Sequence, residues 1–293
     1  MEKKIAVNKD ATTTTTTGGK SGSMFATLVI PIAIIASILI YKFILGAGSN
    51  FEGGDPANHP LPGNTLGIVY KGGFIVPILI ALLMMVLAFS IERFLTISKA
   101  KGSKGIEGFV RTIRMRLNQH DVNGAIAACD AQKGSVANVV KAGLMKYKEM
   151  VADNHLPKDQ KVLAIQKEIE ETTALELPML EKNLVIISTI ASIATLVGLI
   201  GTVLGMIKAF SALSAGGAPD AVGLANGISE ALINTALGIS GSAIAIIMYN
   251  FFTSKIDELT YSIDEAGFSI IQTFASQEGN AATTTTAKAP YTA

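Results

Sequence analysis

The chain has 293 residues, of which 49% are hydrophobic and only 16% charged, and its mean hydropathy is +0.44. Soluble domains typically carry about 25% charged residues, so this composition favours a membrane protein. The formal net charge of +1 indicates no nucleic-acid surface, and the widely separated His59, His120 and His155 predict no metal site. No cofactor is expected.

An enzyme is the poorest fit to the sequence, which shows no nucleophile–base pair and no nucleotide fingerprint. Residues 19–21 read GKS, like the end of a phosphate-binding loop, but position 14 is Thr14 where that loop requires Gly. The surrounding residues 1–23 are rich in Thr and Gly and bury too little apolar surface to order themselves. They are predicted to form a disordered N-terminal tail.

The first apolar stretch, residues 24–45, is long enough to cross a bilayer, which takes about 17–25 apolar residues. A cleaved signal peptide is the alternative, because a Lys-containing flank and the small residues 46–49 imitate that layout. The run exceeds the roughly 7–15 apolar residues of an ordinary signal sequence, which favours a retained helix. Residues 46–73, with several Gly and Pro, would then form an extracytoplasmic loop.

Three further stretches predict membrane spans at residues 74–95, 183–207 and 227–252. The sequence therefore predicts an all-α integral membrane protein with four transmembrane helices. Residues 96–182 are predicted to form a helical cytoplasmic domain, and residues 253–293 a cytoplasmic tail with a disordered end.

Charge bias sets the orientation, because cytoplasmic loops retain Lys and Arg during insertion. The loop of residues 46–73 contains one Lys, Lys71, and no Arg. Seven basic residues follow in the stretch from the second span into the next segment: Arg93, Lys99, Lys101, Lys104, Arg111, Arg114 and Arg116. This bias and the even number of spans place both termini and the single Cys129 in the cytoplasm.

Local signals divide the cytoplasmic segment into helices. Asp121 and Ser135 are typical helix-starting residues, and apolar residues recur at helical spacing from Ser135 to about Tyr147. Pro178 predicts a kink or an interruption just before the third span. The carboxylates of residues 159–182 could form a cation site, but without ligand spacing a solvated helix face explains them better.

Hydroxyl groups recur along one stripe of the third span, where lipid offers them no hydrogen-bond partner. The stripe consists of Ser188, Ser192, Thr195 and Thr202, at spacings of 4, 3 and 7. Taken alone it favours close helix packing over a pore, because hydroxyl and small residues are the usual contacts between membrane helices. Gly198, Gly201 and Gly205 are the candidate packing residues, with Gly238 on the fourth span.

The fourth span contains one charge, Glu230, which lies about 140° around the helix from Thr235. A charge at the bilayer centre costs about 3 kcal/mol or more, so an embedded Glu230 needs a water path, a partner or a proton. The charge-free residues 231–254 could alternatively span about 36 Å by themselves. Glu230 would then lie at the outer headgroup boundary.

Two long motifs resemble a known family. Residues 198–207 read GLIGTVLGMI, and residues 219–238 read PDAVGLANGISEALINTALG, followed by YNFF at 249–252. These segments are similar to the signatures of the ExbB/TolQ/MotA proton-channel family and are most like those of ExbB. The resemblance covers roughly residues 72–252. It departs from the family at Thr195, where many relatives have Pro, and in the additional first span.

The resemblance implies a bacterial inner-membrane protein that forms a homopentamer, whose last two spans surround a central cavity. A single-span partner of the ExbD or TolR type would lie in that cavity and supply the proton-accepting Asp. Thr202 and Thr235 would be cavity-lining hydroxyls, and Glu230 the acidic residue of the last span. The implied function is to couple the proton motive force to outer-membrane import through a TonB-like transducer.

Alternatives remain within and outside the family. A TolQ-like role in envelope maintenance or another stator role would use the same architecture. A membrane scaffold that conducts no ions would use the hydroxyl groups only for helix packing.

Overall fold

The computed structural model describes residues 18–103, 105–214 and 220–286. The long helices are α1 (Gly18–Leu39), α3 (Ile75–Lys101), α7 (Lys158–Glu181), α8 (Leu184–Ser214) and α9 (Ala221–Thr286). The shorter ones are α2 (Thr65–Tyr70), α4 (Ile106–Asn118), α5 (Val122–Gln132) and α6 (Ser135–Ala152). A π-helical turn at Ile40–Leu45 extends α1.

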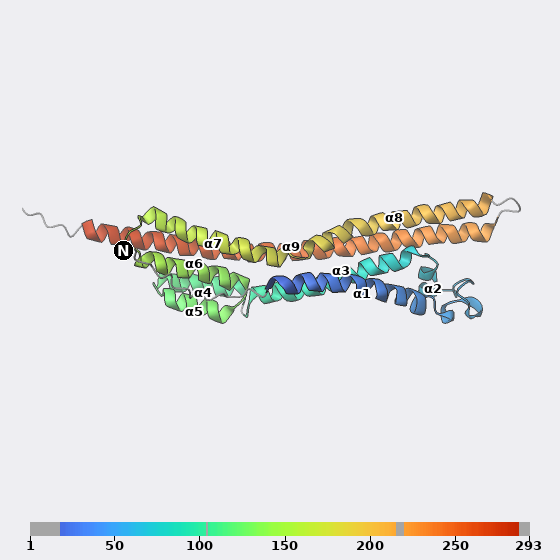
Figure 1. Ribbon diagram of the computed structural model, residues 1–293, viewed down its shortest axis with the longest axis horizontal. Coiled ribbons are helices and arrows are strands. Elements are labelled where there is room, and N and C mark those ends of the chain that lie inside the picture. The colour runs from blue at the N-terminus through green and yellow to red at the C-terminus, as the bar shows by residue number, and fades with distance from the viewer. Residues whose placement is uncertain (1–17, 104, 215–219, 287–293) are drawn as a thin grey trace, which may run out of the picture.

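The predicted all-α membrane fold is confirmed. The described residues form no strand, and four of their helical segments are long and apolar enough to cross a membrane. Figure 1 shows an elongated molecule in which α9 runs along most of the length. Helix α8 lies beside one half of α9, with α1 and α3 nearby, while α4–α7 lie beside the other half. The first half is the apolar, membrane-embedded part, and the second is the helical domain outside it.

Helix α9 has 66 residues and is therefore about 100 Å long, far more than the roughly 30 Å of a hydrocarbon core. The segment after residue 252, predicted as a tail, continues this helix to Thr286. Its buried apolar residues recur every three or four positions on the side that faces α4, α6 and α7: Ile256, Leu259, Ile263, Ala266, Ile270 and Phe274. This amphipathic spacing explains the extension. The disordered end was expected around Thr283–Thr286, which α9 includes as its last residues, and residues 287–293 lie outside the described residues.

Local helix signals predicted between residues 96 and 182 are confirmed. Helix α5 follows Asp121, whose Oδ1 accepts a hydrogen bond of 2.8 Å from the backbone N–H of Gly124. Helix α6 begins at Ser135 and runs beyond the predicted limit near Tyr147 to Ala152. The Tyr147 ring packs edge-on against Phe274 with 5.1 Å between ring centroids. These contacts bind the domain to α9.

The break between α7 and α8 lies at Lys182 and Asn183, a few residues after Pro178, which is inside α7. Asn183 adopts a left-handed backbone conformation with φ of 67°. Arg93 of α3, only 2% exposed, donates hydrogen bonds to the carbonyls of Leu180 at 3.0 Å and Met179 at 3.3 Å. Carbonyls at a helix end lack intrahelical donors. The Arg93 guanidinium therefore stabilises the end of α7.

The neighbouring Glu92 binds Asn183, the residue that precedes α8. Its carboxylate contacts the Arg93 guanidinium and accepts a hydrogen bond of 3.1 Å from the side-chain amide of Asn183. The hydroxyl of Thr96 donates to the same carboxylate at 3.0 Å. One end of α3 thus fixes the elbow from which α8 enters the membrane.

The segment between α1 and α3 forms a small folded unit at the opposite end of the membrane half (Figure 1). Tyr41 stacks on Tyr70 with 4.7 Å between ring centroids. Asn50, which is buried, donates to the carbonyls of Ile44 and Leu45 at 2.8 and 2.9 Å. Lys71 Nζ donates to two carbonyls of the same loop at 3.0 Å. The additional first helix therefore leads directly into an ordered, folded segment that connects it to α3.

Several helix ends differ from the predicted spans. Helix α1 begins at Gly18, inside the predicted tail, and the rest of that tail, residues 1–17, lies outside the described residues. Helix α8 continues past Lys208 to Ser214, and α9 begins at Ala221, so both helices extend into residues 208–226, which the predicted third and fourth spans leave as a loop. The helix pair continues there because the buried Ala209 of α8 packs against Gly227 of α9 and Lys208 pairs with Glu230. Residues 215–219 of that loop lie outside the described residues.

Candidate functional site

The predicted glycines lie where α8 and α9 approach each other most closely. A methyl group added at Gly205 would lie 2.7 Å from both the Ala231 nitrogen and the Gly227 carbonyl oxygen. One added at Gly198 would lie 3.0 Å from the Asn234 carbonyl oxygen, and one at Gly238 only 2.7 Å from that of Ala194. Because backbone faces backbone, side chains larger than hydrogen do not fit. This close approach allows groups on the two helices to contact each other directly.

The two predicted threonines meet across this helix pair. The hydroxyl of Thr202 on α8 contacts the hydroxyl of Thr235 on α9. Thr202 Oγ1 also lies 3.3 Å from the Gly198 carbonyl and 3.5 Å from the Ala231 carbonyl. Both side chains are half-buried. The structure thus brings together two residues 33 positions apart that the family motifs single out.

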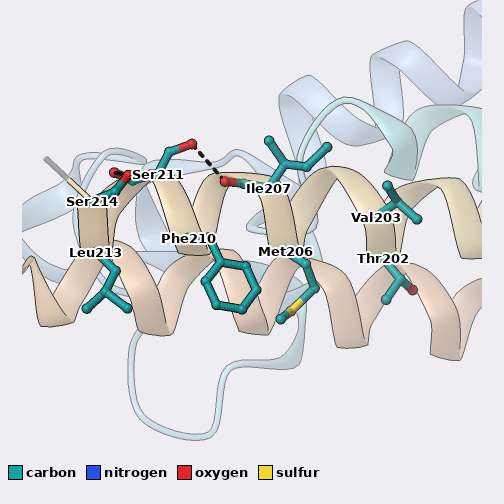
Figure 2. Close-up of a pocket in the computed structure, with 8 residues that line it drawn as sticks. All are labelled: Thr202, Val203, Met206, Ile207, Phe210, Ser211, Leu213 and Ser214. Carbon is teal, nitrogen blue, oxygen red and sulfur yellow. Dashed lines mark hydrogen bonds between the residues drawn. The ribbon is translucent and has the colours of Figure 1, made fainter.

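Thr202 stands at one end of an open groove along α8. The groove has a volume of about 790 Å³ and is lined by Thr202, Val203, Met206, Ile207, Phe210, Ser211, Leu213 and Ser214. Figure 2 shows Leu213, Phe210, Met206 and Thr202 following one another along α8. Val203, Ile207 and Phe210 are each more than half exposed. This apolar face, with a hydroxyl pair at its end, can accept another apolar helix and present a polar group to it.

Glu230 lies away from the threonine pair. The Glu230 residue is buried, and its carboxylate accepts hydrogen bonds of 2.6 and 2.8 Å from Lys208 Nζ on α8. Gly73, which precedes α3 with φ of 76°, packs against this carboxylate so closely that a Cβ there would lie 2.4 Å from Oε1. Glu230 has a partner inside the chain. Lys208 and Glu230 form an ion pair between α8 and α9.

Sequence reasoning missed Lys208, which it placed in a loop. The signal was present, because Lys208 follows a charge-free span and Glu230 is the one charge of the next. Two antiparallel helices joined by a short connection bring such flanking charges together. Opposite charges at the same depth favour each other strongly where water is scarce.

Sequence reasoning also missed the contact that Asn234 makes. This side chain is fully buried, lies against Gly201 and donates a hydrogen bond of 2.8 Å to the Gly72 carbonyl. It therefore ties α9 to the turn before α3. Nearby, Ser242 on α9 donates to the Ala191 carbonyl on α8 at 2.5 Å.

The hydroxyl stripe of α8 does not act as one unit. Ser188 donates to the carbonyl of Val185 in the preceding turn, at 3.1 Å, whereas Thr202 also reaches α9. Backbone-bonded hydroxyls need no other partner in a membrane. Within the described residues, no group of three or more His, Cys, Asp or Glu side chains could hold a metal ion.

Comparison with known proteins agrees with this arrangement. Residues 131–265 match the model of the MotA/TolQ/ExbB proton channel family. The chain is also 38% identical over 88 residues to a protein of Synechocystis sp. named "Putative biopolymer transport protein ExbB-like 3". That alignment covers 29% of this chain and 42% of the relative, so it spans less than half of the relative's length.

Proposed function

We propose that this chain, whose residues 131–265 match the model of the MotA/TolQ/ExbB proton channel family, is a subunit of an inner-membrane motor that powers TonB-dependent outer-membrane import. The family and the apolar helices indicate a multi-pass membrane protein of the proton-channel stator type. The import role, the ExbD-like partner and the TonB-like transducer are parts of the proposal. The ExbB-like relative supports this choice over a TolQ-like role.

The observation that carries the proposal is the Thr202–Thr235 hydroxyl contact at the end of the open α8 groove. Polar groups in a membrane segment face protein or water rather than lipid. A hydroxyl pair on the surface of one subunit is therefore expected to face a shared interior. We propose that a homo-oligomer, most simply a pentamer, encloses this face around the transmembrane helices of the single-span partner.

The proton-accepting group is proposed to come from the partner. Glu230 is occupied by Lys208, and no Asp of this chain lies within the predicted spans. A proton crossing the membrane potential releases about 2.3 kcal/mol per 100 mV. The threonine hydroxyls would hydrate or orient the partner's carboxyl group as this energy is converted into motion.

The same contact also supports the alternative of a scaffold that conducts no ions. Thr202 lies close to the carbonyls of Gly198 and Ala231, so packing alone can satisfy its hydroxyl. The alternatives differ in whether hydroxyl chemistry matters once packing is preserved.

Replacement of Thr202 and Thr235 by Val, singly and together, separates these functions. Val keeps the shape but removes the hydroxyl, so a motor is expected to lose energy-dependent uptake while its oligomer survives on native gels. Thr→Ser at the same positions should retain more uptake. Thr189→Val is the matched control, because Thr189 is on the same helix and donates only to the preceding turn, at 2.6 Å. Full uptake by the double Val variant would support the scaffold.

A second measurement distinguishes the two family roles. The chain, expressed with its native partner, should restore energy-dependent uptake in a host that lacks its own ExbB. Restored envelope integrity in a host that lacks TolQ, without restored uptake, would favour the TolQ-like role instead.

The orientation is proposed from the basic residues at the end of α3 and beyond it, which favour a cytoplasmic location for α4–α7 and both termini. A cysteine introduced at the exposed Lys148 of α6, in a Cys129→Ala background, should then resist a membrane-impermeant maleimide in spheroplasts. Labelling from outside would reverse the orientation.

A further inference from the structure

A second groove runs between α3 and α9, away from the threonine pair. The part of this groove farther from α4–α7 has a volume of about 450 Å³, and its walls include Leu87, Ile91, Phe94, Ile247 and Phe251. A further cavity of about 190 Å³ continues it toward the cytoplasmic domain. The two share Phe94, Phe251 and Phe252. They therefore form one continuous groove.

The part of the groove farther from α4–α7 is apolar and open at the side. Ile91, Phe94 and Ile247 are each more than half exposed, while Phe252 is buried and forms the floor. Aliphatic and aromatic walls of this kind fit hydrocarbon chains.

The other end of the groove is basic. It is lined by Ser98 and Lys101 of α3 and by Lys255 and Glu258 of α9. Lys255 Nζ lies 2.7 Å from the Glu258 carboxylate, so the two lysines and one glutamate leave a net charge of +1. A hydrogen bond from Lys255 lowers the pKa of Glu258. The carboxylate is thus ionised at neutral pH, and Lys101 supplies the unbalanced positive charge.

The length of the groove matches one leaflet of a bilayer. Leu87 and Lys101 are separated by about 21 Å along α3 at 1.5 Å per residue. Half of a hydrocarbon core is about 15 Å thick, which leaves room for a headgroup at the lysines. The apolar walls thus occupy the depth of acyl chains, and the charges occupy the depth of phosphates.

We propose that this groove binds one anionic phospholipid of the leaflet next to the cytoplasmic domain. Its acyl chains lie along Ile91, Phe94 and Ile247, and its phosphate lies between Lys101 and Lys255. A second copy of this chain is a less suitable occupant, because the groove combines an apolar channel with an unbalanced charge at headgroup depth. Basic residues at that depth attract anionic lipids. The lipid would bridge α3, which fixes the α7–α8 elbow, and α9.

Native mass spectrometry of the full-length oligomer in mild detergent tests the proposal. The protein is incubated with equal amounts of phosphatidylglycerol and phosphatidylcholine that have identical acyl chains. A net charge of one at the membrane surface is expected to give about a fivefold preference for phosphatidylglycerol. The double variant Lys101→Gln/Lys255→Gln leaves the Glu258 carboxylate alone, a net charge of −1, and should therefore lose the preference for phosphatidylglycerol.

Two controls separate charge from shape. Lys148→Gln/Lys167→Gln removes the same charge from exposed positions of α6 and α7 and should keep the preference. Ile91→Trp fills the apolar channel and should reduce binding of both lipids. Equal binding of both lipids by the unmodified protein, or an unchanged preference in the Lys101/Lys255 variant, would overturn the proposal. Failure of an intact oligomer to bind either lipid would indicate that a neighbouring copy covers the groove.

Discussion

Replacement of Gly205 by Ala should separate α8 from α9 and destabilise the protein. The new methyl would lie 2.7 Å from two backbone atoms of α9, about 0.7 Å short of the 3.4 Å at which ordinary contact begins. Backbone atoms in a helix cannot move aside individually, so the helices must separate. A gap of 0.5–1 Å forfeits about a quarter to a half of each van der Waals contact.

The expected magnitude follows from two opposing effects. Overpacking a well-packed interior costs about 1–3 kcal/mol, while replacing a helical Gly by Ala returns up to about 1 kcal/mol. With central values of about 2 and 1 kcal/mol, the net loss is about 1 kcal/mol. For a domain of 150–250 residues, each kcal/mol lowers the melting temperature by about 2–4 °C.

Gly241→Ala is the matched control, because Gly241 also lies in an apolar helix of the same pair, α9. Its added methyl would lie 3.8 Å from the nearest atom, the Ala194 side chain. This variant should be as stable as the unmodified protein or slightly more stable. Thermal unfolding in detergent, followed by far-ultraviolet circular dichroism, compares the two. Equal melting temperatures for Gly205→Ala and Gly241→Ala would refute the close approach of the helices.

Three further outcomes are expected. Cys129 is buried and its burial raises the pKa of the thiol to about 12, so even a permeant maleimide should label it only after unfolding, as mass spectrometry would detect. Lys208→Gln should lower the melting temperature more than Glu230→Gln does, because the Glu230 side chain is only 10% exposed and would be left unpaired, whereas the Lys208 side chain is 53% exposed; the reverse order would contradict this pairing. The hydrogen bond from the Gly124 backbone holds the pKa of Asp121 below its usual 3.8, so the ionised group stabilises the fold at neutral pH and this contribution is lost as acid protonates it. Asp121→Ala should therefore destabilise the protein at neutral pH and have little effect in strong acid, in thermal unfolding at both pH values.

The sequence by itself determined the class of protein. Long apolar runs can be satisfied in a bilayer only by helices or closed barrels, and apolar length is a local property. The Asp121 cap is equally local, because its carboxylate accepts a hydrogen bond from the backbone N–H of Gly124, only three residues away. The two motifs also indicated the family whose model residues 131–265 match, because each motif is a contiguous segment.

Only the tertiary structure decided which polar groups meet. Helical geometry placed Glu230 and Thr235 on different faces, but it could not assign Lys208 to Glu230 or Thr202 to Thr235, because these contacts depend on the register between α8 and α9. That register is set by the fit of Gly198 and Gly205 against the backbone of α9. The length of α9 was likewise decided by packing, since Ile263 and Ile270 are apolar residues whose burial requires α4–α7. Pairing between distant segments is a property of the packed interface, and no local sequence pattern specifies it.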